Sequence, residues 1–137
     1  MKKLCLFVLP ILLFATSCSK SVNSGCPTNQ ICTEIFASVG TQFVDANGKS
    51  ISVTDLKVYN LRTKKYIEPK GIIDPGFSPM HYTIVTDSNR KELSSEGDDI
   101  RVTAMYGTKR VESIFKISGG CNCHVEKLSG PDKIVIK

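Results

Sequence analysis

The 137-residue sequence predicts an all-β protein, an antiparallel β-sandwich of about seven short strands stapled by disulfide bonds. Several short segments alternate apolar and polar residues with the period of two that a half-buried strand requires. Turn-forming residues separate these segments, and no segment shows a convincing helical repeat. Four cysteines stand in two pairs near opposite ends of the expected domain, where bonds between them would close the fold.

The N-terminus has the features of an export signal. Lys2 and Lys3 precede an apolar run over residues 4–14, which has the length of a secretory signal's apolar segment and is shorter than the roughly 20 residues that span a bilayer. The small residues at 15–17 then lead into Cys18. This stretch resembles the lipobox of bacterial lipoproteins.

The lipobox resemblance implies that residues 1–17 are a lipoprotein signal peptide and that Cys18 is lipidated and becomes the first mature residue. Ala15 stands where Leu is most familiar, a looser form that is common in Bacteroidota-type lipoproteins. The alternative is an ordinary signal peptide cut near Ser17, with Cys18 an incidental thiol. Two or more acyl chains would hold the protein stably on a membrane.

The resemblance also gives an expected location and organisation. Residues 18–30 begin with small polar residues that predict a flexible tether, and residues 31–137 form the sandwich domain. Acidic residues after the lipidated cysteine can direct such lipoproteins to the cell surface, and the tether has none. We therefore expect an outer-membrane protein, preferably on the periplasmic side.

The first two expected strands flank a hairpin signal. Residues 35–44 alternate, with Ile35, Val39 and Phe43 on one face. Asn47-Gly48 is the strongest short hairpin signal in the chain, because both residues tolerate positive φ. Residues 54–63 form the next expected strand.

The rest of the chain is expected to continue as strands and turns. Residues 68–79 contain prolines and glycines and predict a loop. Residues 88–99 are polar, with room for one short helical turn. The remaining expected strands are residues 80–87, 100–107, 110–118, 124–128 and 133–137.

A second resemblance concerns the fold. The segment "VGTQFVDANGKSISVTDLKVYNLRT" at 39–63, with its D-x-N-G turn, looks like the opening of carboxypeptidase regulatory-like and transthyretin-like sandwich domains, and "HYTIVTDSNRKEL" at 81–93 suits a later strand of theirs. Gln42 and Phe43 stand where those domains usually have a glycine. The resemblance implies an Ig-like or transthyretin-like sandwich, a fold used in accessory, adhesive or scaffold modules.

Composition argues against several partner classes. The formal net charge of +5 is mild and its basic residues are scattered, so nucleic acid is not an expected partner. The densest basic patch, residues 62–65, is interpreted as a solvated hairpin end. The absence of tryptophan weakens the case for a sugar-stacking surface.

Of the six cysteines, Cys5 would leave with the signal peptide and Cys18 would carry lipid, so four remain in the exported domain. An even number of cysteines in an exported chain indicates disulfides. We favour two bonds from the N-terminal segment to the penultimate strand, for example Cys26 to Cys121 and Cys32 to Cys123. The other pairing considered, Cys26 to Cys32 and Cys121 to Cys123, makes a very tight second ring.

The same residues allow a second interpretation, a metal site or redox-active thiols formed by Cys121, Cys123 and His124. Their C-x-C spacing differs from the usual C-x₂-C, and His124 is interpreted as a partly buried strand histidine. We found no serine elbow motif or glycine-rich phosphate loop. The sequence therefore favours a non-enzymatic envelope protein without a cofactor, which binds another envelope protein or assembly; the alternative is a periplasmic metal-binding or thiol-redox protein.

Overall fold

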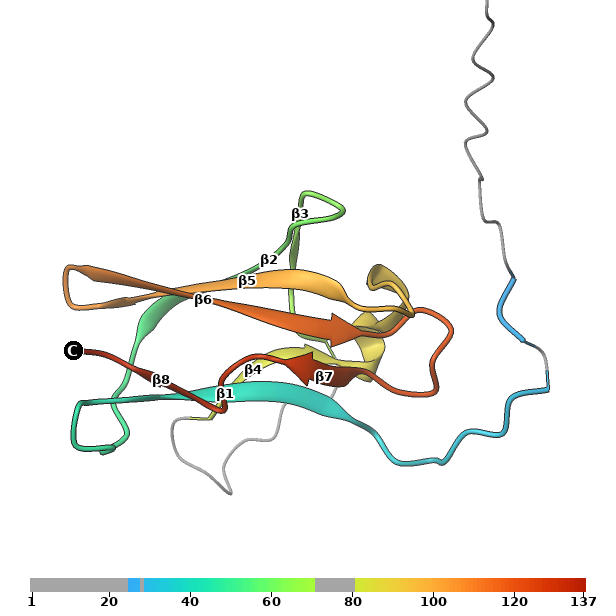
Figure 1. Cartoon of the computed structure of the whole chain (residues 1–137), viewed down its shortest axis with the longest axis horizontal. Coiled ribbons are helices and arrows are strands. Elements are labelled where there is room, and N and C mark those ends of the chain that lie inside the picture. Colours follow the sequence, from blue (N-terminus) through green and yellow to red (C-terminus); the bar gives the residue numbers. More distant parts are fainter. Residues whose placement is uncertain (1–24, 28, 71–80) are drawn as a thin grey trace, which may run out of the picture.

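A computed structural model describes residues 25–27, 29–70 and 81–137. The expected signal segment, Cys18 and most of the expected tether lie outside the described residues, as do residues 71–79 of the expected loop. The described part is a two-layered β-sandwich (Figure 1). Its elements are β1 (Ser38–Val44), β2 (Thr54–Asn60), β3 (Lys65–Ile67), β4 (His81–Thr86), the 3₁₀ helix η1 (Asp87–Glu92), β5 (Asp98–Tyr106), β6 (Lys109–Ser118), β7 (Glu126–Ser129) and β8 (Lys133–Val135).

One sheet has the strand order β4-β1-β8 and the other has the order β3-β2-β5-β6-β7, so the predicted sandwich is confirmed. One strand pair departs from the expected antiparallel arrangement, because β8 runs parallel to β1. The chain crosses from β7 in one sheet to β8 in the other at Gly130 and Pro131. There the hydroxyl of Thr41 lies within hydrogen-bond distance of the Pro131 and Asp132 carbonyls, which fixes the crossing against β1.

The hydrophobic core lies between the sheets and draws side chains from both. Phe43 and Phe115 are essentially inaccessible, and the ring of Tyr82 meets Phe43 edge-on with centroids 5.2 Å apart. Burial of such side chains supplies most of the favourable free energy of folding. The other members of this core cluster are Val39, Val53, Val58, Ile67, Ile84, Val85, Leu93, Ile100, Val102, Ala104, Ile117, Val125, Ile134 and Ile136.

The turn at Asn47-Gly48 forms, but the expected hairpin does not: β1 and β2 lie in different sheets, and an isolated bridge between Val44 and Ser50 closes the turn. Gly48 has φ of +82°, and Asp45 Oδ1 accepts hydrogen bonds from the backbone N–H groups of Asn47 and Lys49 at 2.9 Å each. The expected helical turn is η1, which is capped by Thr86 and Asn89. Among the described residues, no helix has the length and apolar character needed to cross a membrane.

The N-terminal part of the first expected strand is an exception. Strand β1 begins at Ser38, and Ile35 is 70% exposed instead of facing the core. The alternation therefore predicts a strand that begins three residues too early. Residues 29–36 are exposed and belong to neither sheet. Disulfide bonds hold this segment in place.

Candidate binding surface and the disulfide clasp

Two disulfides, called the clasp below, join the N-terminal segment to the domain. They link Cys26 to Cys121 and Cys32 to Cys123, with sequence separations of 95 and 91 residues, which confirms the favoured pairing. Cys121 and Cys123 lie in the loop between β6 and β7, so their expected place in a strand was wrong. Since Cys26 is bonded to the domain, this part of the expected 18–30 tether is fixed to it.

His124 sits beside the clasp in a row of three hydrogen-bonded side chains. Its Nδ1 lies 2.7 Å from Asp87 Oδ2, and its Nε2 lies 2.8 Å from the hydroxyl of Thr33. Its side chain is 25% exposed, so it is partly buried as expected, although in the loop before β7. The row connects the clasped segment, the loop and η1.

Asp87 organises this region as a hydrogen-bond acceptor. Burial alone would raise the pKa of Asp87, but hydrogen bonds from the backbone N–H of Ala37, from His124 and from the backbone N–H of Val125 outweigh it and hold the pKa below its ordinary value. The ionised carboxylate requires the proton of His124 on Nδ1. The Thr33 hydroxyl can donate to a neutral His124 or accept from a charged one.

A hydroxyl, an imidazole and a carboxylate in a row also have the geometry of a nucleophile activated by an oriented base. We did not predict this from the sequence, because Thr33, Asp87 and His124 are far apart along the chain. Neither Thr33 nor His124 lines the four hollows that the described residues form around β2, β3 and β5.

The structure also bears on the metal or thiol interpretation of Cys121, Cys123 and His124. In the disulfide form the sulfurs of Cys121 and Cys123 are bonded to Cys26 and Cys32 and are not thiolates. Across residues 25–27, 29–70 and 81–137, no three His, Cys, Asp or Glu side chains form a group that could hold a metal ion. The loop is instead tied to η1, since Arg90 donates to the carbonyls of Asn122 and Cys123.

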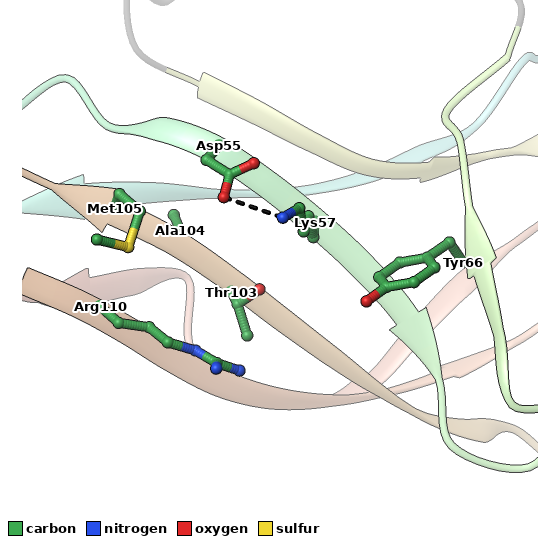
Figure 2. A pocket seen from close by; sticks show the side chains of 7 residues that line it. All are labelled: Asp55, Lys57, Tyr66, Thr103, Ala104, Met105 and Arg110. Carbon is green, nitrogen blue, oxygen red and sulfur yellow. Dashed lines mark ion pairs between the residues drawn. The ribbon is translucent and has the colours of Figure 1, made fainter.

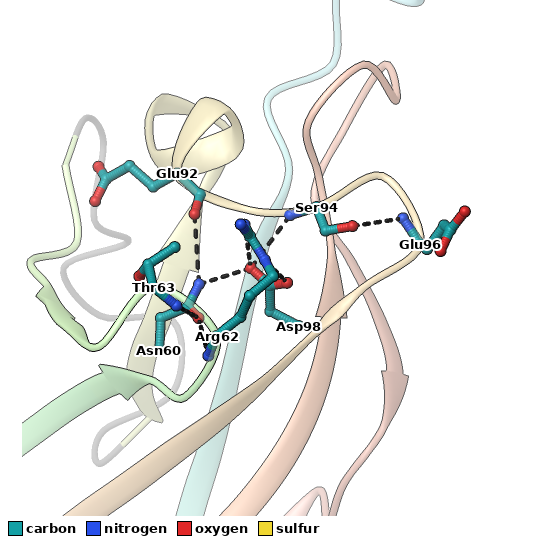
Figure 3. A network of polar contacts seen from close by, with 7 residues as sticks. All are labelled: Asn60, Arg62, Thr63, Glu92, Ser94, Glu96 and Asp98. Carbon is teal, nitrogen blue, oxygen red and sulfur yellow. Dashed lines mark hydrogen bonds and ion pairs between the residues drawn. The ribbon is translucent and has the colours of Figure 1, made fainter. Parts of the chain in front are cut away.

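A buried carboxylate holds the turn after β2 (Figure 3). Arg62 binds both oxygens of Asp98, at 2.5 and 2.9 Å, and Asn60 donates to the same group at 2.7 Å. Burial raises the pKa of Asp98, but these bonds and a further one from the backbone N–H of Ser94 outweigh it, so the pKa lies below its ordinary value. Because Asn60 Oδ1 also accepts from the N–H groups of Arg62 and Thr63, the network fixes the start of the β2–β3 hairpin.

Two contiguous hollows lie over the outer face of the five-stranded sheet, with volumes of about 310 and 470 Å³. We call them together the sheet groove, because both are lined by Tyr66, Thr103 and Arg110. Figure 2 shows Arg110 of β6 and Tyr66 of β3 extending toward Thr103 from opposite sides. The other lining residues are Asp55, Lys57, Tyr59, Lys64, Arg101, Ala104 and Met105.

Strand register explains how the groove forms. Lys57 pairs with Thr103 and Tyr59 with Arg101, while their buried neighbours Val58 and Val102 pair on the core side. Tyr59 also pairs with Tyr66 across the β2–β3 hairpin, and their rings meet edge-on with centroids 5.0 Å apart.

This aromatic pair is not predicted from the sequence. Tyr59 is expected in a strand and residues 62–65 at the end of a hairpin, but this expectation does not extend the pairing to Tyr66. The two tyrosines lie seven residues apart around that turn, a signal that could have identified the pair.

Comparisons of the chain with protein-family models, with curated protein sequences and with solved structures found no significant match. Functional inference for this chain therefore depends on its own residues and geometry.

Proposed function

We propose that the protein is a non-catalytic envelope lipoprotein, anchored through Cys18 to the outer membrane, that works by binding a partner molecule at the sheet groove. The groove is the observation that carries the proposal. It places four cationic side chains and two tyrosines on a paired sheet: Lys57, Lys64, Arg101, Arg110, Tyr59 and Tyr66. Side chains held on strands keep a fixed spacing, which lowers the entropic cost of binding.

The clasp supports export of the domain. Disulfides persist in oxidising compartments such as the bacterial periplasm and are rare in the cytosol. The two bonds connect the domain to a segment that starts eight residues after Cys18. The lipobox-like sequence and the clasp thus favour the same location, the cell envelope.

The anchor is tested by labelling cells with an alkyne analogue of palmitate and fractionating their envelope. The wild type should incorporate the label and sediment with outer membranes, whereas Cys18→Ser should do neither. Cys5→Ser is the matched control, because Cys5 precedes the expected cleavage site. An unlabelled wild type released in soluble form would contradict the anchored function.

Binding at the groove is tested by placing a photo-crosslinking residue at position 57 in the exported chain. We expect a discrete adduct with an envelope component that is absent when the same residue replaces Lys133, which is exposed in the other sheet. Equal adducts from both positions, or none from position 57, would contradict binding there.

A hydrolase is the second candidate, favoured by the row of Thr33, His124 and Asp87. The activated Thr33 hydroxyl would attack an ester carbonyl, passing its proton through His124 to the departing alcohol and keeping the acyl group, and water would then release that group as the acid and restore Thr33. Turnover of p-nitrophenyl acetate by the exported chain that is lost in both Thr33→Val and His124→Gln would favour this candidate. Turnover unchanged from buffer would favour the binding protein.

A further inference from the structure

The lining of the sheet groove is strongly biased toward positive charge. Its charged residues are Lys57, Lys64, Arg101 and Arg110 against the single carboxylate of Asp55. One further carboxylate outside the lining, Glu112, lies 3.2 Å from Arg101 and 3.1 Å from Arg110. The Arg101 contact is an ion pair only, because its N–H is not aligned for a hydrogen bond.

The acidic partners do not close the groove to an anion. The Asp55–Lys57 pair and the two Glu112 pairs are all between exposed or half-exposed side chains, with 40% or more of each side chain accessible. Exposed pairs of this kind contribute little to stability, so a multivalent anion can replace them. One Glu112 shared by two arginines also leaves guanidinium donors for a ligand.

Backbone conformation adds an independent observation. Among the described residues, the non-glycine residues with positive φ are Asp55 at 51° and Lys64 at 56°, and both line the groove. Asp55 lies where the β2–β5 register shifts between Thr54 and Lys57. Such conformations are strained in non-glycine residues and concentrate at ligand sites, while bulges re-aim side chains. The two strained backbone positions therefore belong to residues whose charged side chains line the groove.

The aromatic part of the groove suits the rings of sugars. Tyr66 is 65% exposed and is supported from the side by Tyr59, so its face and hydroxyl are available to a ligand. A ring of this kind offers both an apolar face for C–H groups and a polar tip for hydroxyls. Thr103 lies between Tyr66 and Arg110 and supplies a further hydroxyl (Figure 2).

The shape of the groove favours a chain over a compact ligand. Its lining on β5 runs from Arg101 to Met105, about 13 Å at the rise of an extended strand, and the groove is open along the sheet. An extended acidic peptide fits less well, because peptides gain affinity by pairing with a free strand edge. Here the groove's lining runs along β5, which pairs with β2 on one side and with β6 on the other and so offers no backbone partners.

We propose that the sheet groove binds an anionic polysaccharide, with Lys57, Arg101 and Arg110 contacting its carboxylate or phosphate groups and Tyr66 stacking on its sugar rings. This inference rests on the proposed function, since it assigns the chemistry of the ligand at the same site. The shared chemistry is an acidic sugar chain, whether the acid is a carboxylate or a phosphate. Lys64 extends the cationic lining at the hairpin end.

Calorimetry with the full exported chain in detergent tests the proposal directly. The probes are polygalacturonate, phosphorylated dextran, unmodified dextran, poly-glutamate and a thymidine oligonucleotide, each at low and at physiological salt. We expect one or both acidic sugar chains to bind at least ten-fold more tightly than dextran and than the two other polyanions, with affinity that falls as salt rises. Tighter binding of poly-glutamate or of the oligonucleotide, or equal binding of all polyanions, would overturn the proposal.

Matched variants distinguish binding at the groove from nonspecific attraction to the protein's positive charge. Arg110→Gln should weaken acidic-sugar binding at least five-fold and reduce its salt dependence, and Tyr66→Ala should weaken it without changing that dependence. Lys133→Gln removes the same charge from the other sheet and should leave binding unchanged. If Lys133→Gln weakens binding as much as Arg110→Gln, the groove is not the site. Crosslinking from position 57 together with no binding of acidic sugars would refute this inference and leave the proposed function standing.

Discussion

Cys32 is bonded to Cys123, and the ring that this bond closes overlaps the ring closed by Cys26 and Cys121 over almost its whole length. With one bond in place, the other closes a new ring of only about eight residues, which chain-entropy estimates value at about 2.5 kcal/mol. A single bond that closes the whole domain, with a sequence separation of 95 residues, is valued at about 4.7 kcal/mol.

The two disulfides should therefore contribute non-additively. We predict that Cys32→Ser/Cys123→Ser, which leaves one bond, lowers the free energy of unfolding by about 2.5 kcal/mol, and that removing both bonds lowers it by about 7 kcal/mol. Urea unfolding followed by circular dichroism measures both. If removing the first bond and removing the second lowered the free energy of unfolding equally, the overlap of the two rings would have no effect on the entropy of the unfolded chain.

The ion pair between Asp98 and Arg62 should contribute more than any exposed pair. The Asp98 side chain is 1% exposed, so Asp98→Asn loses a bidentate partner inside the protein, and we predict a loss of about 2–4 kcal/mol. Asp55→Asn is the matched control, because its pair with Lys57 is exposed and should change stability by less than about 0.5 kcal/mol. Similar losses for both variants in urea unfolding would contradict the role of burial.

Acid should destabilise the protein through Asp87 and Asp98. Both have folded pKa values below the ordinary 3.8, so they bind fewer protons when folded than when unfolded. Their contribution to stability is complete above about pH 5 and is lost as the pH falls below 3.8 through the folded values. Unfolding free energies measured from pH 6 to pH 2 should fall steeply in the wild type and less steeply in Asp87→Asn and Asp98→Asn. If the wild type and both variants lost stability with the same dependence on pH, groups other than Asp87 and Asp98 would cause the destabilisation by acid.

The sequence predicted the sandwich and the clasp well because both depend on local or countable features. Alternating segments marked strands, Asn47-Gly48 marked a tight turn, and only three pairings of four cysteines exist. The short β3 and the parallel pairing of β8 with β1 were not predicted, since neither leaves a pattern in three residues of sequence.

The groove and the row at His124 could not be predicted for a different reason. The groove depends on which residues of distant strands come into register, such as Thr103 with Lys57 and with Glu112. A one-residue change of register would move these side chains to the core face, and no local signal in β5 fixes the register against both neighbours. The acceptor bonds of Asp87, by contrast, link Ala37, His124 and Val125 only once the sheets have packed.

Gly130 should be indispensable at the crossing from β7 to β8. Its φ of +124° is unfavourable for any side chain, and an added Cβ would lie 2.4 Å from Phe115 Cδ1 in the core. Gly48 is the matched control, because its φ is also positive but a Cβ there would meet open space. We predict that Gly48→Ala costs about 1 kcal/mol and Gly130→Ala at least about 3 kcal/mol, because only the second displaces a buried ring. If thermal and urea unfolding gave equal losses for the two variants, the close approach of Gly130 to Phe115 would have no role in stability, and backbone conformation alone would explain both.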